Sequence, residues 1–184
     1  MDAGRAYNPL DDVVAFDPPL HVHGLGWEEH IPFAMAMMSL HRPRSFVELG
    51  VQSGDSYLGF CQAAQRLGVE VTCRGVDTWK GDAHAGFYGD QVLGTLRAKH
   101  APYEKFSTLM QMTFDEALQH VEDRSVDLLH IDGYHVYEAV QHDFQTWLPK
   151  VDPERGIVLF HDIRERGREF GVWKFWAERS EEHT

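Results

Sequence analysis

Two aspartates follow apolar, strand-like runs in the second half of this sequence, and each has a histidine close by. Asp132 ends one run and is followed three residues later by His135, whereas His161 and Asp162 together end the next run. A carboxylate that leaves a buried strand is costly unless it is paired, hydrogen-bonded or bound to a cation. Because neighbouring parallel strands lie about 5 Å apart, we expect the two acids to be close enough to share one ion.

Two kinds of chemistry fit this set of side chains. Carboxylate oxygens suit Mg²⁺ or Ca²⁺, whereas two histidines with one carboxylate suit iron or another transition metal. Because the imidazole group as a class can exchange a proton near neutral pH, His135 is also a candidate base for a substrate hydroxyl. The sequence therefore predicts catalytic roles for Asp132, His135 and His161, with Asp132 and Asp162 as ligands of a metal.

A second pattern lies earlier, where an apolar run ends in Glu48 and two glycines, Gly50 and Gly54, enclose a three-residue turn. Glycine lets a ligand approach the main chain closely. Asp77 ends the next apolar run, where a doubly wound fold places a carboxylate on a ribose. Gln52 breaks the dinucleotide pattern G-x-G-x-x-G, and Glu48 would repel a pyrophosphate. A cationic nucleoside ligand therefore fits this loop better than a dinucleotide.

The predicted ligand-binding residues follow the first three strands of the chain. They are Glu48, Gly50, Gln52, Ser53, Gly54, Asp77, Thr78, Met112 and Thr113.

Alternating strand and helix patterns position these residues. Strands are predicted over 45–49, 71–76, 106–110, 126–131 and 156–160, and helices over 27–40, 56–67, 90–100, 114–121, 137–148 and 170–179. This alternation predicts an α/β fold, a Rossmann-like doubly wound parallel sheet, which binds ligands at the carboxyl ends of its strands. Residues 1–26 are predicted to form an irregular arm ahead of a single domain over 27–184.

The composition of the chain limits the kinds of molecule that it can be expected to bind. The chain has 184 residues and a net charge of −12, which argues against nucleic-acid binding because that needs a basic surface. No apolar run approaches the roughly 20 residues of a membrane span, and no signal pattern is present. Cys61 and Cys73 lack C-x-x-C spacing and are predicted to be reduced, buried thiols of a cytoplasmic protein. A small-molecule substrate is therefore expected.

Four runs of the sequence carry a family resemblance: FVELGVQSGDSY, GVDTWKGDAHAGFYGD, LLHIDGYHVYEAVQHDFQTWLPK and GIVLFHDI. They resemble class I S-adenosylmethionine-dependent methyltransferases, in the group that includes cephalosporin hydroxylase and macrocin O-methyltransferase. Within that group they are most similar to bacterial domains associated with glycosyltransferases. The resemblance covers roughly residues 27–178.

The resemblance implies an O-methyltransferase that acts on a sugar, a glycan or a small natural product. It implies that Glu48, Gly50 and Asp77 hold S-adenosylmethionine, and that Asp132 and Asp162 can hold Mg²⁺. The chain departs from the metal-binding members at His161, since their pattern has two adjacent acids there. It also ends before the two further strands of the class I fold, so the sheet is expected to lack its C-terminal strands and to leave an edge that favours a homodimer.

Two other functions remain open from the sequence. One is a non-haem metal oxygenase that uses His135, His161 and an aspartate, although such an enzyme needs no nucleoside site. The other is a non-catalytic module that partners a glycosyltransferase.

Overall fold

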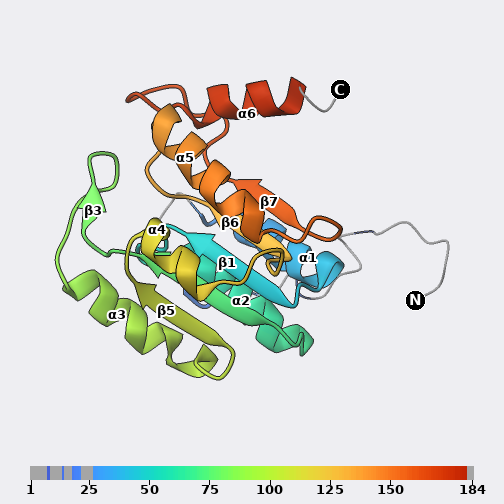
Figure 1. Ribbon diagram of the computed structural model, residues 1–184. Coiled ribbons are helices and arrows are strands. Elements are labelled where there is room, and N and C mark those ends of the chain that lie inside the picture. Colours follow the sequence, from blue (N-terminus) through green and yellow to red (C-terminus); the bar gives the residue numbers. More distant parts are fainter. Residues whose placement is uncertain (1–7, 9–13, 15–17, 22–26, 182–184) are drawn as a thin grey trace.

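Five parallel strands form the central sheet of the computed structural model, which describes residues 8, 14, 18–21 and 27–181 (Figure 1). Their spatial order is β5-β2-β1-β6-β7. The strands are β1 (Ser45–Leu49), β2 (Thr72–Asp77), β5 (Ser107–Gln111), β6 (Leu128–Ile131) and β7 (Ile157–Phe160). The predicted α/β fold with a doubly wound parallel sheet is thus confirmed, while most of the predicted arm over 1–26 lies outside the described residues.

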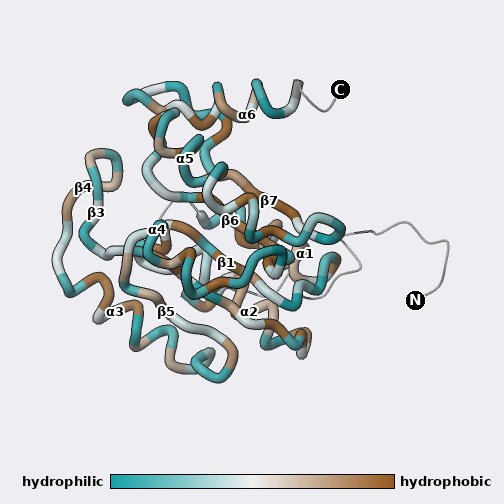
Figure 2. Tube along the Cα trace, viewed as in Figure 1, coloured by the Kyte–Doolittle hydropathy of each residue, from teal (hydrophilic) through white to brown (hydrophobic). Residues whose placement is uncertain are grey.

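Helices cover both faces of the sheet because successive strand residues point to opposite sides. Phe46 of β1 belongs to an apolar cluster with α1 (Ile31–His41), α2 (Asp55–Leu67) and α3 (Gln91–His100). Its neighbour Val47 belongs to a second cluster with α4 (Phe114–Ala117) and α5 (Tyr137–Trp147). Figure 2 shows apolar residues along the central strands and polar residues along the outer turns.

The last helix, α6 (Val172–Glu181), packs against α5. Its Phe175 contacts Phe144 of α5 and Phe160 of β7, and Trp176 also contacts Phe160. Among the described residues, β7 pairs only with β6, so its outer edge carries no strand partner. No described helix is long and apolar enough to cross a membrane.

Three local features differ from the sequence predictions or refine them. The predicted helix over 27–40 begins only at Ile31, after a turn, because Pro32 is favoured in a first helical turn and not deeper. Between the strand predicted over 71–76 and the helix predicted over 90–100, the structure has a small hairpin, β3 (Gly81–Asp82) with β4 (Gly86–Phe87). Thr113 and Glu116 form a capping box at the start of α4.

The side of β1 on which new strands are added to the sheet switches between β5 and β6, so the switch point lies between β1 and β6. The strands that follow β1 continue to one side as β2 and β5, and the chain then crosses over to form β6 and β7. In an open parallel sheet, ligands bind in the crevice outside the carboxyl ends of the strands at such a switch point. Both Cys61 and Cys73 are free and buried, as the sequence predicts.

Candidate active site

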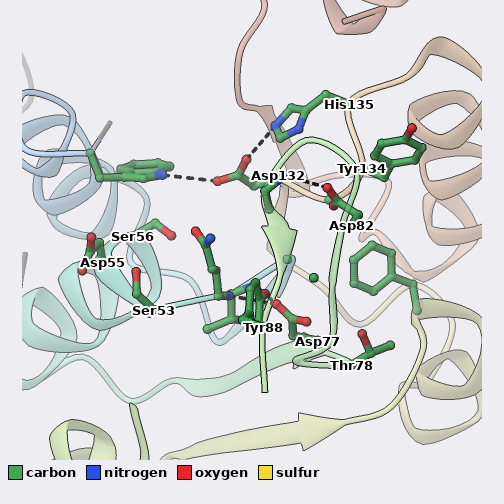
Figure 3. A pocket seen from close by; sticks show the side chains of 18 of the residues that line it. Ser53, Asp55, Ser56, Asp77, Thr78, Asp82, Tyr88, Asp132, Tyr134 and His135 are labelled. Carbon is green, nitrogen blue, oxygen red and sulfur yellow. Dashed lines mark hydrogen bonds and ion pairs between the residues drawn. The ribbon is translucent and has the colours of Figure 1, made fainter. Parts of the chain in front are cut away.

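A cavity of about 590 Å³ lies at this switch point. Its wall comprises the loop after β1, the first turn of α2, the end of β2, the hairpin, the start of α4 and the turn after β6. The volume falls within the range of small-molecule sites, about 300–1,000 Å³. Figure 3 shows Ser53, Asp55 and Ser56 on one side of it and Asp82, Tyr134 and His135 on the other.

The loop after β1 passes very close to the turn after β6. Gly50 has φ of +91°, and a Cβ there would lie 2.0 Å from the carbonyl oxygen of Asp132. A side chain at this position is excluded by both the backbone angle and the space. The glycine therefore brings the two halves of the site into direct contact.

Asp77 holds this loop in shape through backbone hydrogen bonds. Its Oδ2 accepts from the N–H groups of Val51 (3.0 Å) and Gln52 (2.8 Å), and its Oδ1 accepts from that of Trp79 (2.7 Å). A carboxylate has about four acceptor positions, so one position on Oδ1 remains for a ligand. Asp77 thus combines a structural role with a place on the cavity wall.

Glu48 lies beneath the loop and not on the cavity wall. It is fully buried, its Oε1 accepts from the Ser56 hydroxyl at 2.7 Å, and its Oε2 lies 3.0 Å from Nδ1 of His130. Burial raises the pKa of Glu48 above its usual value, against the opposing effect of His130 and Ser56. Both carboxylate oxygens are therefore engaged inside the protein.

Asp132 gathers three nitrogen donors around one carboxylate. Its Oδ2 accepts from Nε1 of Trp27 at 3.2 Å, and its Oδ1 lies 3.2 Å from both Nε2 of His135 and Nδ1 of His161. Asp162 joins this cluster, with its Oδ2 at 3.3 Å from Nε2 of His135. The His161 ring also stacks on Trp27, with ring centres 4.8 Å apart.

The charges in this cluster stabilise one another. Burial alone raises the pKa of Asp132, but hydrogen bonds and charge from His135 and His161 outweigh it and hold that pKa well below its usual value. Burial likewise lowers the pKa of His161, but Asp132 and Asp162 outweigh it and raise the pKa to about 10. The hydrogen bond to His161 lowers the pKa of Asp162. At neutral pH the cluster therefore holds a histidine cation between two carboxylates.

The structure brings most predicted residues to one cavity. Those on the cavity wall are Gly50, Gln52, Ser53, Asp77, Thr78, Thr113, Asp132 and His135. Glu48, Gly54 and Met112 do not line it, and His161 and Asp162 approach from behind Asp132 and line a second cavity along β7. Ligand atoms of Asp132, His135 and His161 lie within 4.8 Å of one another, which is close enough to hold one metal ion.

Several wall residues were not anticipated from the sequence. Trp27 reaches Asp132 from 105 positions earlier in the chain, and no local pattern signals that contact. Asp82 and Tyr134 face the cavity from the hairpin and from the turn after β6 (Figure 3). Asp55 could have been found, because it directly follows Gly54 and directly precedes the helix predicted over 56–67.

Together, the parallel sheet, the glycine loop and the strand-end acids define a Rossmann-like domain with a nucleoside-type cavity at its switch point. A family profile described as "Methyltransferase domain" matches residues 47–163. The chain therefore belongs to this family of methyltransferase domains.

A curated relative and two solved structures extend this comparison. The chain is 48% identical over 170 residues to the uncharacterized protein y4gI of Sinorhizobium fredii, an alignment that covers 92% of this chain but only 18% of that protein. The O-methyltransferase TomG of Streptomyces achromogenes, solved with SAM, has a TM-score of 0.62 at 12% identity over 92% of this chain and 78% of that one. Cofactor-bound Rv0187 from MTB has a TM-score of 0.64 at 12% identity, covering 95% of this chain and 76% of that one.

Because their identity to this chain is low, these solved structures show a shared fold and nothing more. That fold is the class I methyltransferase fold. Family and fold agree in identifying the chain as a methyltransferase domain. The chain spans less than a fifth of the curated relative that it matches.

Proposed function

We propose that this domain transfers the methyl group of S-adenosylmethionine to a hydroxyl of a small molecule or glycan. The observation that carries the proposal is the charge of the cavity wall. It presents Asp55, Asp77, Asp82 and Asp132, and no lysine or arginine among the described residues lines it. Such a wall favours a ligand with a sulfonium and an ammonium group, and disfavours a pyrophosphate.

The proposed cofactor site is the half of the cavity next to the glycine loop. In this arrangement Asp77 accepts a hydrogen bond from a ribose hydroxyl through the open position on Oδ1. Gln52, Ser53, Thr78 and Thr113 complete the wall around the nucleoside. Glu48 accepts a hydrogen bond from the Ser56 hydroxyl and acts through it. In this scheme Glu48 is therefore a positioning residue.

The proposed chemistry lies at the other half, around Asp132. The hydroxyl oxygen of the acceptor attacks the methyl carbon in line with the departing sulfur, and its proton leaves to a base. We assign the base to His135, with Asp132 as the carboxylate that orients the imidazole and stabilises its cation. Holding the two reactants in line supplies much of the rate in such a transfer.

The acceptor is proposed to be uncharged or cationic and rich in hydroxyl groups. Asp82 faces the cavity, and its Oδ1 accepts from the N–H groups of His84 and Ala85, which leaves Oδ2 for a substrate hydroxyl. Tyr88 and Tyr134 add aromatic walls. A sugar, a glycan or a small natural product fits these groups, whereas an acidic acceptor would meet like charge.

The residues around Asp132 also fit a divalent metal ion. Two imidazoles with a carboxylate form a mixed nitrogen and oxygen set, which suits a transition metal better than Mg²⁺, an ion that prefers oxygen. Asp132, His135 and His161 would hold the ion with Asp162 beside them. The chemistry that a bound ion supplies is a lower pKa of the acceptor hydroxyl and a fixed orientation.

Three further expectations from the sequence stay predictions: a cytoplasmic location, a homodimer and association with a glycosyltransferase. The open outer edge of β7 supports an added partner, since unpaired strand edges favour pairing with another chain.

The proposed cofactor site is tested by calorimetry with S-adenosylhomocysteine, with and without a chelator. We expect the wild-type domain to bind it and Asp77→Asn to weaken binding about 10- to 100-fold, because the amide places an N–H where acceptors are needed. The matched control is Asp90→Asn, an exposed acid before α3 that lies outside the cavity. Absence of binding by the wild type, or unchanged affinity in Asp77→Asn, would overturn the assignment.

A further inference from the structure

The side chain of His135, the proposed base, lines the cavity but is only 17% exposed. Its Nε2 faces the carboxylates of Asp132 and Asp162. Its Nδ1 is buried and has no hydrogen-bond partner among the described residues. A base must come within hydrogen-bond reach of the proton that it takes. An acceptor hydroxyl therefore reaches Nδ1 only if a segment that covers His135 moves.

Two aromatic side chains pack around the His135 ring. Phe170 stacks on it with ring centres 4.6 Å apart, and the His84 ring centre lies 6.0 Å away. His84 stacks on Phe170 as well, at 4.5 Å. The two imidazoles are too close together to lie on opposite faces of the Phe170 ring. They therefore lie side by side on one face, with His84 at the edge of the His135 ring.

The Phe170 side of this packing is fixed by the backbone. The N–H of Gly171 donates to the carbonyl oxygen of His135 at 2.7 Å. A Cβ at Gly171 would lie 2.3 Å from the backbone nitrogen of Tyr137, so the two segments pack without space between them. Movement of Phe170 away from His135 would break these contacts.

The His84 side has much less support. His84 lies at the tip of the β3–β4 hairpin, where its N–H and that of Ala85 donate to Oδ1 of Asp82. Each strand of this hairpin has two residues, and so small a hairpin is marginally stable without contacts to the rest of the fold. Figure 1 shows it standing apart from the central sheet. The residues on either side of His84 are exposed, and Phe87 is 81% exposed.

The base of the hairpin combines a fixed point with flexible residues. Trp79 is 2% exposed, and its Nε1 donates to the carbonyl oxygen of Gln52 at 2.9 Å, which anchors the chain where it leaves β2. Gly81 and Gly86 have φ of +75° and +81°, and glycine also adopts negative φ at little cost. The hairpin can therefore turn at these glycines while Trp79 stays in place.

We propose that the β3–β4 hairpin is a lid over His135, and that His84 is the latch that holds it shut against Phe170 and Tyr134. The ring centres of His84 and Tyr134 lie 4.7 Å apart. The inference rests on the acceptor half of the cavity proposed above and adds how that half opens. Asp82 and Tyr88 line the cavity from this hairpin, so closure brings both side chains to the acceptor and excludes water.

The test measures the rate at which diethyl pyrocarbonate modifies His135, resolved by tandem mass spectrometry. This reagent acylates unprotonated imidazole nitrogens that it can reach, and the exposed His120 serves as the internal standard. We expect wild-type His135 to react at least about tenfold more slowly than His120. In His84→Ala the rate at His135 should rise at least about fivefold, because the loss of two ring contacts favours the open hairpin.

Two control variants show whether the His84 ring is the latch. Phe87→Ala changes an exposed residue of the same hairpin and should leave the rate at His135 within about twofold of wild type. His84→Phe keeps a ring against Phe170 and should protect His135 as the wild type does.

Each outcome decides the proposal. If wild-type His135 reacts as fast as His120, no lid covers it. An unchanged rate in His84→Ala, an equal rise in Phe87→Ala, or loss of protection in His84→Phe would overturn the latch. The wild-type rate and His84→Phe keep the test decisive where His84→Ala fails to fold. Calorimetry with S-adenosylhomocysteine tests the cofactor site separately, since the modification rates do not depend on that ligand.

Discussion

Asp127 and Asp132 lie at opposite ends of strand β6, and their partners differ in kind. Asp127, just before the strand, is fully buried and accepts from the backbone N–H and the guanidinium of Arg44. Asp132, just after the strand, contacts Trp27 and two histidines. Asp127 is held by a guanidinium that is always charged. Asp132 is held in part by two imidazoles, which can gain or lose a proton.

The difference separates stability from chemistry along a single strand. Hydrogen bonds from Arg44 hold the pKa of Asp127 below its usual value, so that this carboxylate stays ionised. The imidazoles of His135 and His161 can exchange protons or bind a metal instead, and His135 faces the cavity. In parallel sheets the carboxyl ends of strands carry the ligand site, and the opposite end is free to serve the fold.

The largest effect in this comparison is expected from Asp127→Asn. Loss of the charge weakens three hydrogen bonds from Arg44, and we expect the free energy of unfolding to fall by about 2 kcal/mol. Urea denaturation measures this loss, which should be the same at pH 6 and pH 9 because arginine keeps its charge. The affinity for S-adenosylhomocysteine should stay within about twofold, and a large loss of affinity would contradict the separation of roles.

A second effect, one that depends on pH, is expected from His161→Gln. The pKa of His161 is raised to about 10 in the folded protein and is near 6.5 when unfolded. Its contribution to stability is therefore fully present below pH 6.5 and is lost as the pH rises through 10. In the presence of a chelator, the stability difference between wild type and His161→Gln should shrink by at least about 1 kcal/mol between pH 6 and pH 9. A difference that stays constant, like that of Asp127→Asn, would mean that folding does not raise the pKa of His161.

The smallest effect is expected from Trp27→Phe. This change removes the indole hydrogen bond to Asp132 but keeps an aromatic ring against His161. We expect the free energy of unfolding to fall by about 1 kcal/mol, the usual value of one hydrogen bond. Urea denaturation at pH 7 checks this, and a loss as large as that of Asp127→Asn would show that the tryptophan dominates the cluster.

The sequence was sufficient to predict the order of strands and helices and the end of the sheet that carries the site. Apolar runs that end in Glu48, Asp77 and Asp132 identify strands and their carboxyl ends, because each run is apolar enough to be buried and then stops at an acid. β1 has the predicted bounds, Ser45–Leu49. The glycines around the first loop likewise predicted close backbone packing, which Gly50 shows against Asp132.

Contacts between distant segments could not be predicted in the same way. The sequence does not reveal that Glu48 turns inward to His130, since both faces of β1 are buried and either direction is compatible with its pattern. The contact between Trp27 and Asp132 depends on how α1 docks beside β6.

A crystal structure of the domain with S-adenosylhomocysteine tests the central claim most directly. The claim is that one cavity binds the cofactor along the glycine loop and presents its sulfur to the cluster around Asp132. We expect the ribose at Asp77 and the sulfur facing Asp132 and His135. A ligand bound in the second cavity along β7, or one with its sulfur turned away from Asp132, would contradict the account.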